Sequence, residues 1–398
     1  MADDDLRPPP IGLWPLFLRF LRFGALAFGG PVAQIAMIRR ELVERDRWMS
    51  SARFNRLLAV MQALPGPEAH ELCVHMGVRA RGRRGGLVAG LGFMLPGFLL
   101  MLAAAWAWFR FDVGQGALAP ALLGAQAAVI GLIARAVERI GRHILVGRSL
   151  WLVAGLALPA TLAGVPFWIV LPAGALVHGL AATGRRGAAL AALALAVGIS
   201  ALWLLRPAAP QAVDAVVAAA APASVLALFL TGLKAGLLTF GGAYTAIPFV
   251  RADVVPRGWM SDATFLDGVV MAKVMPAPLV IFATFVGYAA GGFPGALAVT
   301  AGVFLPAFAF SMVLHDRLEQ VVGTPAVHAV LDGVAGAVVG VIAATVFQLA
   351  AGLVDEGAAW PLVVIGGLAV VAASTLKGRF AAPLILAAAA AAGQLWLG

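Results

Sequence analysis

Three side chains in one short stretch have the spacing of a proton-transfer site. In "PEAHELCVH", residues 67–75, Glu68, Glu71 and His75 are separated by three and then four positions, so a helix would place them on one face. Glu71 and His75 could then pass a proton or bind a cation. The alternative is that these groups neutralise the arginines at 79–84, and the sequence leaves both roles open.

The same stretch does not fit a metal-dependent enzyme. A zinc-protease helix carries two histidines four residues apart with a glutamate beside the first, whereas His70 and His75 are one residue too far apart. Cys73 is the only cysteine, which excludes a disulfide within the chain and a cysteine-based metal site. We therefore expect neither an enzyme nor a bound cofactor.

Anion binding is the second chemistry, at glycine-rich breaks in apolar segments. "FGGP" at 28–31 and "FGGA" at 240–243 begin half-helices whose free N–H groups and positive dipole ends attract anions. Arg22 and Lys234 each precede their break by six residues; they are functional candidates, although snorkelling to the headgroups is an alternative. The full candidate set is Gly29, Gly30, Pro31, Gly241, Gly242, Arg22, Lys234 and Lys273, with Pro65, Gly66, Pro67, Pro276 and Pro278 at a second pair of breaks.

Composition places these residues in an integral membrane protein. Of the 398 residues, 62% are hydrophobic and 12% are charged, and the mean hydropathy is +0.96, whereas soluble domains carry about 25% charged residues. We expect about 13 apolar segments, several of them long enough to cross a bilayer. The net charge of +9 comes from short arginine clusters between these segments, which is typical of cytoplasmic loops and not of a nucleic-acid-binding face.

The chain contains an internal repeat that includes both kinds of break. "RWMSSARF" at 47–54 aligns with "GWMSDATF" at 258–265, and "LPGP" at 64–67 aligns with "MPAP" at 275–278. "GGLVAGLGFMLPGF" aligns in the same way with "PGALAVTAGVFLPAF". We predict a disordered lead-in at 1–11, a first repeat at 12–182 and a second repeat at 224–398. The linker between the repeats, 183–223, contains one unpaired helix.

The unpaired helix, at 187–205, sets the relative orientation of the two repeats. If each repeat begins and ends on one side of the bilayer, one extra crossing turns the second repeat upside down. The predicted fold is thus an all-α polytopic membrane protein with two inverted-topology repeats and broken or re-entrant helices. This architecture is typical of secondary transporters with a site near the bilayer midplane.

Loop charge favours re-entrant hairpins at the breaks. With the N-terminus inside, the arginines at 79–84, 139–148 and 185–186 all lie inside, as the positive-inside rule requires. The arginine-rich loop at 39–53 lies inside only if the segments 12–38 and 54–78 are hairpins. Full crossings by both segments are the alternative.

No nucleotide-binding motif is visible, so the expected driving force is a gradient. The sequence has no phosphate-binding loop of the Walker type. Moving one charge across 100 mV is worth about 2.3 kcal/mol, so expelling a dianion from a negative interior gains roughly 4.6 kcal/mol per 100 mV. Efflux of an anion is electrically downhill, whereas uptake needs coupled cations.

Nearly the whole chain, from about residue 12 to 397, resembles the chromate ion transporter family. The resemblance rests on "FGGPVAQIAMIRRELVERDRWMS", "LPGPEAHELCVHMG" and "GGLVAGLGFMLPGFLLML" in the first half, and on "FGGAYTAIPFVRADVV", "MPAPLVIFATFVGY" and "GVFLPAFAF" in the second. It implies a multi-pass exporter of chromate in the bacterial inner membrane, conferring chromate resistance, with sulfate as a further candidate substrate. It leaves the oligomeric state open, with a homodimer among the candidates.

The resemblance carries over unevenly between the two halves. The family's glycine-proline motif falls on Gly29, Gly30 and Pro31, and its proline-glycine-proline motif on Pro65, Gly66 and Pro67. In the second half, Ala243 replaces the first motif's proline and Ala277 replaces the second motif's glycine. His70 and Glu71 stand where many members have a Thr-Gln pair, and a carboxylate there repels a dianion unless it is protonated or paired.

Two transport hypotheses follow, together with a third from another class. The first is an alternating-access exporter of a tetrahedral oxyanion held between the glycine breaks. The second is a proton-coupled carrier of sulfate or another small solute, organised around Glu68, Glu71 and His75. The third is a membrane assembly without transport activity, or an enzyme. The sequence does not separate chromate from other oxyanions, nor does it give the coupled ion or its stoichiometry.

Overall fold

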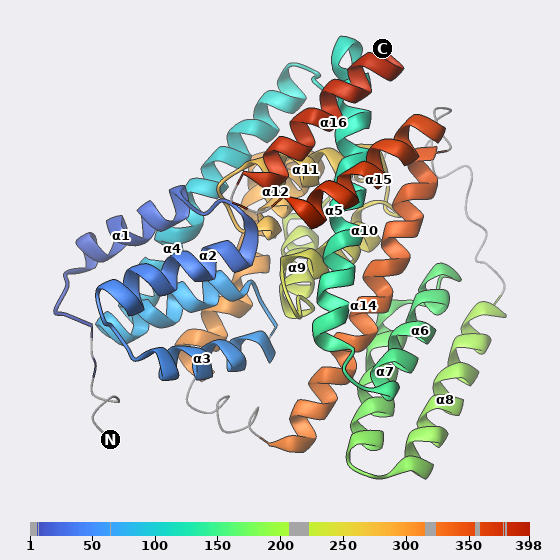
Figure 1. Ribbon diagram of the computed structural model, residues 1–398, viewed down its shortest axis with the longest axis horizontal. Coiled ribbons are helices and arrows are strands. Elements are labelled where there is room, and N and C mark those ends of the chain that lie inside the picture. The colour runs from blue at the N-terminus through green and yellow to red at the C-terminus, as the bar shows by residue number, and fades with distance from the viewer. Residues whose placement is uncertain are drawn as a thin grey trace.

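A computed structural model describes residue 6 and the ranges 8–63, 65–206, 223–314, 324–354, 359–376 and 380–398, with the single residue 378. Every regular element in these ranges is a helix (Figure 1). Helices α4, α5, α8, α12 and α14 contain stretches long and apolar enough to cross a membrane, and five shorter helices are also apolar. The all-helical, multi-pass membrane class is therefore confirmed. Most of the predicted lead-in, and 207–222 of the linker, lie outside the described residues.

The main helices of the described chain vary in length. In the first half they are α1 (Leu13–Ala25), α2 (Gly30–Ile38), the π-helical η1 (Arg39–Arg45), α3 (Ser51–Ala63), α4 (Glu68–Arg110), α5 (Ala119–Ile144), α6 (Arg148–Leu162) and α7 (Phe167–Ala182). Helix α8 (Arg186–Leu204) follows. In the second half they are α9 (Val225–Leu237), η4 (Ala243–Thr245), α10 (Ala246–Val254), α11 (Asp262–Val274), η5 (Leu279–Ile281), α12 (Phe282–Ala309), η6 (Phe310–Leu314), α14 (Pro325–Val354), α15 (Ala359–Thr375) and α16 (Ala381–Leu397).

The chain reverses at the first glycine break. Arg19, midway along α1, forms an ion pair with Asp46 just after η1, and its guanidinium carbon lies 5.0 Å from the centroid of the Trp48 ring. Two helices that continued in one direction would hold these residues far apart, because a helix advances about 1.5 Å per residue. Helices α1 and α2 with η1 therefore form a hairpin whose turn contains Gly29 and Gly30.

Helix α4 is two antiparallel helices joined at Arg81 and Gly82. Gly82 has φ 62° and ψ −159°, a region open essentially to glycine alone. The two halves pack closely, since a Cβ atom on Gly77 would lie 2.3 Å from the carbonyl oxygen of Gly85. In one continuous helix these two residues would be about 12 Å apart.

Helix α12 has the same reversal at the aligned position. Gly292 has φ 60° and ψ −152°, and Gly287 packs against Gly295 as closely as Gly77 packs against Gly85. The hydroxyl groups of Thr284 and Thr300 are 2.7 Å apart across this second hairpin. The two aligned stretches thus share one backbone device, a glycine reversal between closely packed helices.

The two halves of the chain exchange packing partners. Helix α5 packs against α15 and α16, whereas α14 packs against α6 and α7 (Figure 1). Small residues allow these helices to approach: Gly124 lies against the backbone of Ala389, and Gly333 lies against that of Gly174. Helices of each half therefore pack directly against helices of the other half.

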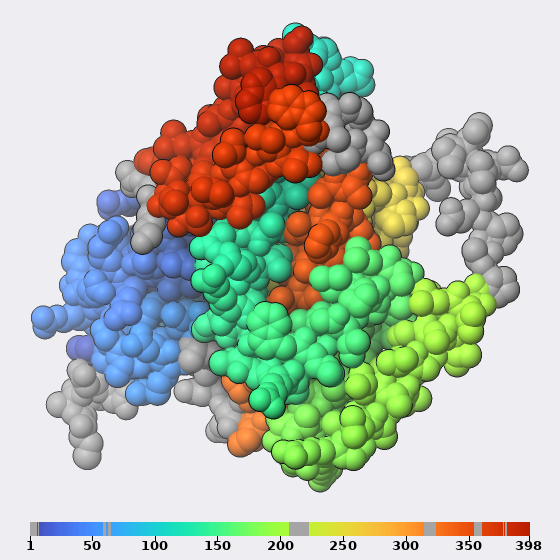
Figure 2. All heavy atoms as spheres, turned by 45° about the vertical axis from the view of Figure 1, so that its right-hand side comes forward, coloured from blue at the N-terminus to red at the C-terminus, as the bar shows by residue number. Residues whose placement is uncertain are grey.

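Helix α8, between the two halves, is the most exposed long helix of the described chain. Only Ala189 on it is buried, and leucines such as Leu190 and Leu202 face outward. Figure 2 shows it along the edge of the molecule, in yellow-green. An apolar helix exposed in this way is suited to contact with lipid.

Candidate functional site

A cavity of about 550 Å³ lies where the first glycine break meets the second half of the chain. Helix α5 forms one wall, the end of α11 and the segment after it form another, and the neighbouring ends of α15 and α16 complete it. The lining residues with polar or break-forming character are Gly29, Gly30, Pro31, Arg135, Arg139, Tyr244, Lys273 and Ser374.

The backbone at the break presents helix N–H groups to this cavity. Gly29 and Gly30 have φ values of 91° and 76°, which L side chains rarely adopt, and Pro31 lies in the first turn of α2. No side chain in the described part of the chain caps the helix, so its first N–H groups can bind a ligand. A Cβ atom on Gly30 would meet nothing within 4 Å, which leaves room for an anion to approach the backbone.

Among the described residues, three basic side chains line the cavity. Lys273 bonds to the hydroxyl of Tyr244, and its Nζ lies 3.8 Å from the centroid of that ring. Arg135 pairs with Glu138, which lies outside the lining and also pairs with Arg142 at 2.5 Å. Among the described lining residues there is no carboxylate. A helix N-terminus and three cations together are suited to a multiply charged anion.

The breaks of the two halves bond to one another near this cavity. The Gln34 side chain, in α2, donates from Nε2 to the carbonyl oxygens of Ala27 at 2.8 Å and Ala277 at 3.1 Å. The backbone N–H of Gly66 donates to the carbonyl oxygen of Thr239 at 2.8 Å. The glycine break of each half is therefore tied to the proline break of the other.

Replacing Gln34 with leucine should destabilise the protein by about 1–3 kcal/mol. Gln34 is 1% exposed, and the substitution would leave two buried carbonyl oxygens without their present donor. Thermal unfolding of the detergent-solubilised protein measures this effect. Gln394→Leu, on the exposed surface of α16, is the matched control; an equal loss in both variants would show that the Gln34 bridge contributes nothing.

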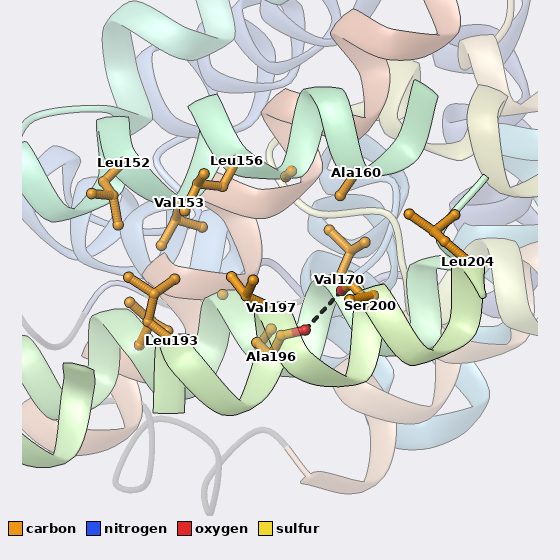
Figure 3. Close-up of a pocket in the computed structure, with 15 residues that line it drawn as sticks. Leu152, Val153, Leu156, Ala160, Val170, Leu193, Ala196, Val197, Ser200 and Leu204 are labelled. Atoms are coloured by element: carbon orange, nitrogen blue, oxygen red, sulfur yellow. Dashed lines mark hydrogen bonds between the residues drawn. The ribbon is translucent and has the colours of Figure 1, made fainter. Parts of the chain in front are cut away.

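A further cavity, close to the exposed helix α8, does not suit an anion. It holds about 300 Å³ between α6, α7 and α8, and aliphatic side chains line it (Figure 3). Among the described lining residues only Ser200 carries a hydroxyl group, and that hydroxyl already donates to the carbonyl oxygen of Ala196 at 2.8 Å. Binding a dianion there would cost its hydration without replacement.

The cavity lined by Arg135, Arg139 and Lys273 is called the basic cavity below. Comparison with known proteins identifies the family to which the chain belongs. The sequence pattern described as "Chromate transporter" matches residues 14–221 and 226–394. The chain is 61% identical to the chromate transport protein of Pseudomonas aeruginosa, over 88% of this chain and 84% of that protein. It is 33% identical to the chromate transport protein of Cupriavidus metallidurans, over 86% of this chain and 84% of that protein.

The chain belongs to the chromate transporter family. A probable chromate transport protein of Synechococcus elongatus is a further relative, 30% identical over 98% of this chain and 96% of its own length. No solved structure matches the chain. The resemblance noted from the motifs is thereby confirmed, and the protein is an anion transporter of the chromate class.

Of the three cations predicted from the sequence, the transporter places only Lys273 in the cavity. Arg22 is exposed on α1 and is absent from the lining. Lys234 pairs with Asp253 and lies over the ring of Phe167, with 4.8 Å between its Nζ and the ring centroid. Its charge is therefore balanced within the second half.

The second glycine break is built differently from the first. Gly241 and Gly242 have φ values of 71° and 117°, but a Cβ atom on Gly241 would contact Ile140 and Ile144 of α5. Neither glycine lines the cavity, although the following Tyr244 does. Pro276 and Pro278 flank Ala277, which lines it, whereas Pro65, Gly66 and Pro67 belong to the break that bonds to Thr239.

Arg135 and Arg139 were missed as site residues, although the sequence carries a signal for them. They are spaced i, i+4 and so share a helix face, and Arg135 follows directly on a stretch, 118–134, that contains no charged residue. The pair was missed because the arginines at 139–148 were assigned to a cytoplasmic loop, which separated Arg139 from Arg135. Only the three-dimensional structure shows that both line one cavity together with the first glycine break.

The predicted proton-transfer residues are buried at the start of α4. Glu71 is 1% exposed, and neither of its carboxylate oxygens has a hydrogen-bond partner among the described residues. Glu68 and His75 are also buried, and His70 packs against Phe304 and Phe308 with ring centroids 4.8 Å apart. A Cβ atom on Gly66 would lie 2.2 Å from Glu71 Oε1, so glycine there makes room for the carboxyl group.

Proposed function

We propose that the protein exports chromate from the bacterial cytoplasm across the inner membrane and thereby confers chromate resistance. The observation that carries this proposal is the cavity lined by the α2 N-terminus, Arg135, Arg139 and Lys273. A tetrahedral dianion bound there would accept hydrogen bonds from the free backbone N–H groups and from the cations. The basic cluster at the end of α5 favours the cytoplasmic side for its opening.

The membrane potential is sufficient to drive this export. A dianion that leaves a compartment held at −100 mV gains roughly 4.6 kcal/mol, which is more than a thousandfold in concentration ratio. The transporter needs no bound cofactor for this step. It must only keep the two ends of its pathway from opening together.

Alternating access between inverted repeats would satisfy that requirement. The matching reversals at Gly82 and Gly292 and the exchange of partners between α5 and α14 support a pseudo-symmetric pair of repeats. The α1–α2 hairpin supports re-entry at the first glycine break, because Arg19 meets Asp46 again on the return path. Rocking of one repeat against the other would then expose the cavity to each side in turn.

Flux measurements on the purified protein in proteoliposomes test the proposal. With a potential negative on the side of the cavity, radiolabelled chromate should leave that side at a rate that rises with the potential, and sulfate should be assayed beside it. Lipid vesicles without protein provide the baseline. Absence of both chromate and sulfate flux from correctly folded protein would exclude the proposal.

The burial of Glu71 favours a second candidate function, a proton-coupled carrier of sulfate or another small solute. A buried carboxyl group with no hydrogen-bond partner among the described residues is a candidate proton carrier in a membrane protein. On this reading, Glu71→Gln abolishes flux driven by a pH gradient at zero potential, and Glu68 and His75 relay the proton. A wild-type flux that follows the potential and ignores the pH gradient would exclude it.

A further inference from the structure

A second cavity, of about 370 Å³, lies on the same two helices as the basic cavity but at their other ends. Helix α5 contributes Gln126 from its first half to this cavity, and α11 contributes Thr264 and Asp267. Farther along the same helices, Arg135 and Lys273 line the basic cavity. Both helices thus run from the second cavity towards the first.

The interval between the cavities is short and apolar. Gln126 and Arg135 are nine residues apart on α5, or about 13 Å along the helix axis. Ala128, Val129 and Val269, from the intervening turns of α5 and α11, are completely buried. The two cavities are therefore separated by an apolar seal of a few turns, as expected for two ends of one pathway in a closed state.

The charge of the second cavity is opposite to that of the first. Its ionisable lining residues in the described chain are Asp112 and Asp267, and no basic residue lines it. Asp112 is exposed at the mouth, with a left-handed φ of 51°, whereas Asp267 is 5% exposed. An anion that crosses the seal would leave a cavity whose described lining has three cations and enter one whose described lining has two carboxyl groups.

A side-chain amide holds the deeper carboxylate in place. Gln126 Nε2 donates to Asp267 Oδ1 at 2.7 Å and to the carbonyl oxygen of Ala263 at 3.3 Å. The Gln126 Oε1 atom is buried and has no hydrogen-bond partner among the described residues. It adds a further hydrogen-bond acceptor beside the carboxylate, and acceptor oxygens do not bind an oxyanion.

We propose that this cavity is the release end of the oxyanion pathway, and that Asp267 keeps its affinity for the anion low. The proposal rests on the proposed export function. Like charges in a partly dehydrated cavity repel strongly, so the anion leaves quickly and anions outside rebind poorly. The direction of net transport still comes from the membrane potential; Asp267 sets the difference in affinity between the two sides.

The test compares Asp267→Asn with Asp267→Glu in oriented proteoliposomes. Asparagine keeps an oxygen that can accept from Gln126 but removes the charge, whereas glutamate keeps the charge. The measurements are the KM for chromate on the side of the basic cavity and the inhibition of efflux by chromate or sulfate added on the opposite side. Size-exclusion profiles of the three proteins verify folding.

In Asp267→Asn, inhibition from the release side should strengthen at least tenfold, while the KM on the loading side changes less than twofold. Asp267→Glu should retain the weak inhibition of the wild type. Unchanged release-side inhibition in a folded Asp267→Asn protein would overturn the proposal, as would an equal change on both sides or in both variants. Absence of flux in the wild type would instead reject the export function itself.

Discussion

Lys273→Met is expected to lower chromate flux about tenfold to a hundredfold at concentrations below saturation. A hydrogen bond from a charged donor contributes about 1.5–3 kcal/mol, and Lys273 is a cation of the second half that lines the basic cavity. Methionine keeps most of the side chain's apolar volume but removes the donor and the charge. The measurement is kcat/KM for chromate in proteoliposomes.

Arg22→Gln is the matched control for this variant. Both residues were predicted from the sequence as anion-binding cations, but Arg22 is exposed on α1 and absent from the cavity lining. We expect its flux to remain within twofold of the wild type. A strong loss in Arg22→Gln together with a normal Lys273→Met would place the anion elsewhere.

Gly77→Val is expected to remove most of the folded protein. A Cβ atom at this position would lie 2.3 Å from the carbonyl oxygen of Gly85, and backbone atoms cannot yield as a flexible side chain does. We expect a cost of about 3 kcal/mol or more, a large part of the stability of a typical domain. The yield of monodisperse protein after detergent extraction measures the effect.

Two further valine variants show whether this loss reflects the hairpin. Gly287→Val should be equally damaging, because Gly287 packs on Gly295 in the corresponding hairpin of α12. Gly155→Val, in α6, should be tolerated, since a Cβ atom there meets nothing within 4 Å. Equal yields from Gly77→Val and Gly155→Val would contradict the closely packed reversal.

The breaks were predictable from the sequence because glycine and proline act locally. Gly29 and Gly30 adopt positive φ values, as the "FGGP" motif suggests, and the reversal at Gly82 falls in the arginine-rich stretch between two predicted apolar segments. The reversal at Gly292 falls at the position that the sequence alignment pairs with Gly82. These features depend on neighbours in the chain, and sequence reasoning reaches them.

The residues that line the basic cavity could not be predicted from the sequence in the same way. Lys234 finds its partner Asp253 on another helix, whereas the aligned Arg22 faces outward. Arg135 and Arg139 lie on α5, and the cavity brings them together with the first glycine break and with Lys273 of the second half. Helix packing over about a hundred residues of sequence decides which cations gather, and the repeat pattern does not contain that information.

The aligned positions of the two halves also differ in chemistry more than the repeat suggests. Glu68 and Glu71 align with Leu279 and Phe282, so carboxyl groups occur at one proline break and apolar groups at the other. Two segments with aligned sequences can therefore carry unlike chemical groups. The first glycine break lines a cavity together with basic side chains, whereas the second lies against isoleucines of α5.

The most direct test of the central claim is to locate chromate in crystals of the protein by the anomalous scattering of chromium. The account predicts one dominant peak in the basic cavity, within hydrogen-bonding reach of Lys273 Nζ and the first N–H groups of α2. A dominant peak beside Gly241 and Gly242 or against Glu71 would contradict it, as would an empty cavity at a chromate concentration that saturates transport.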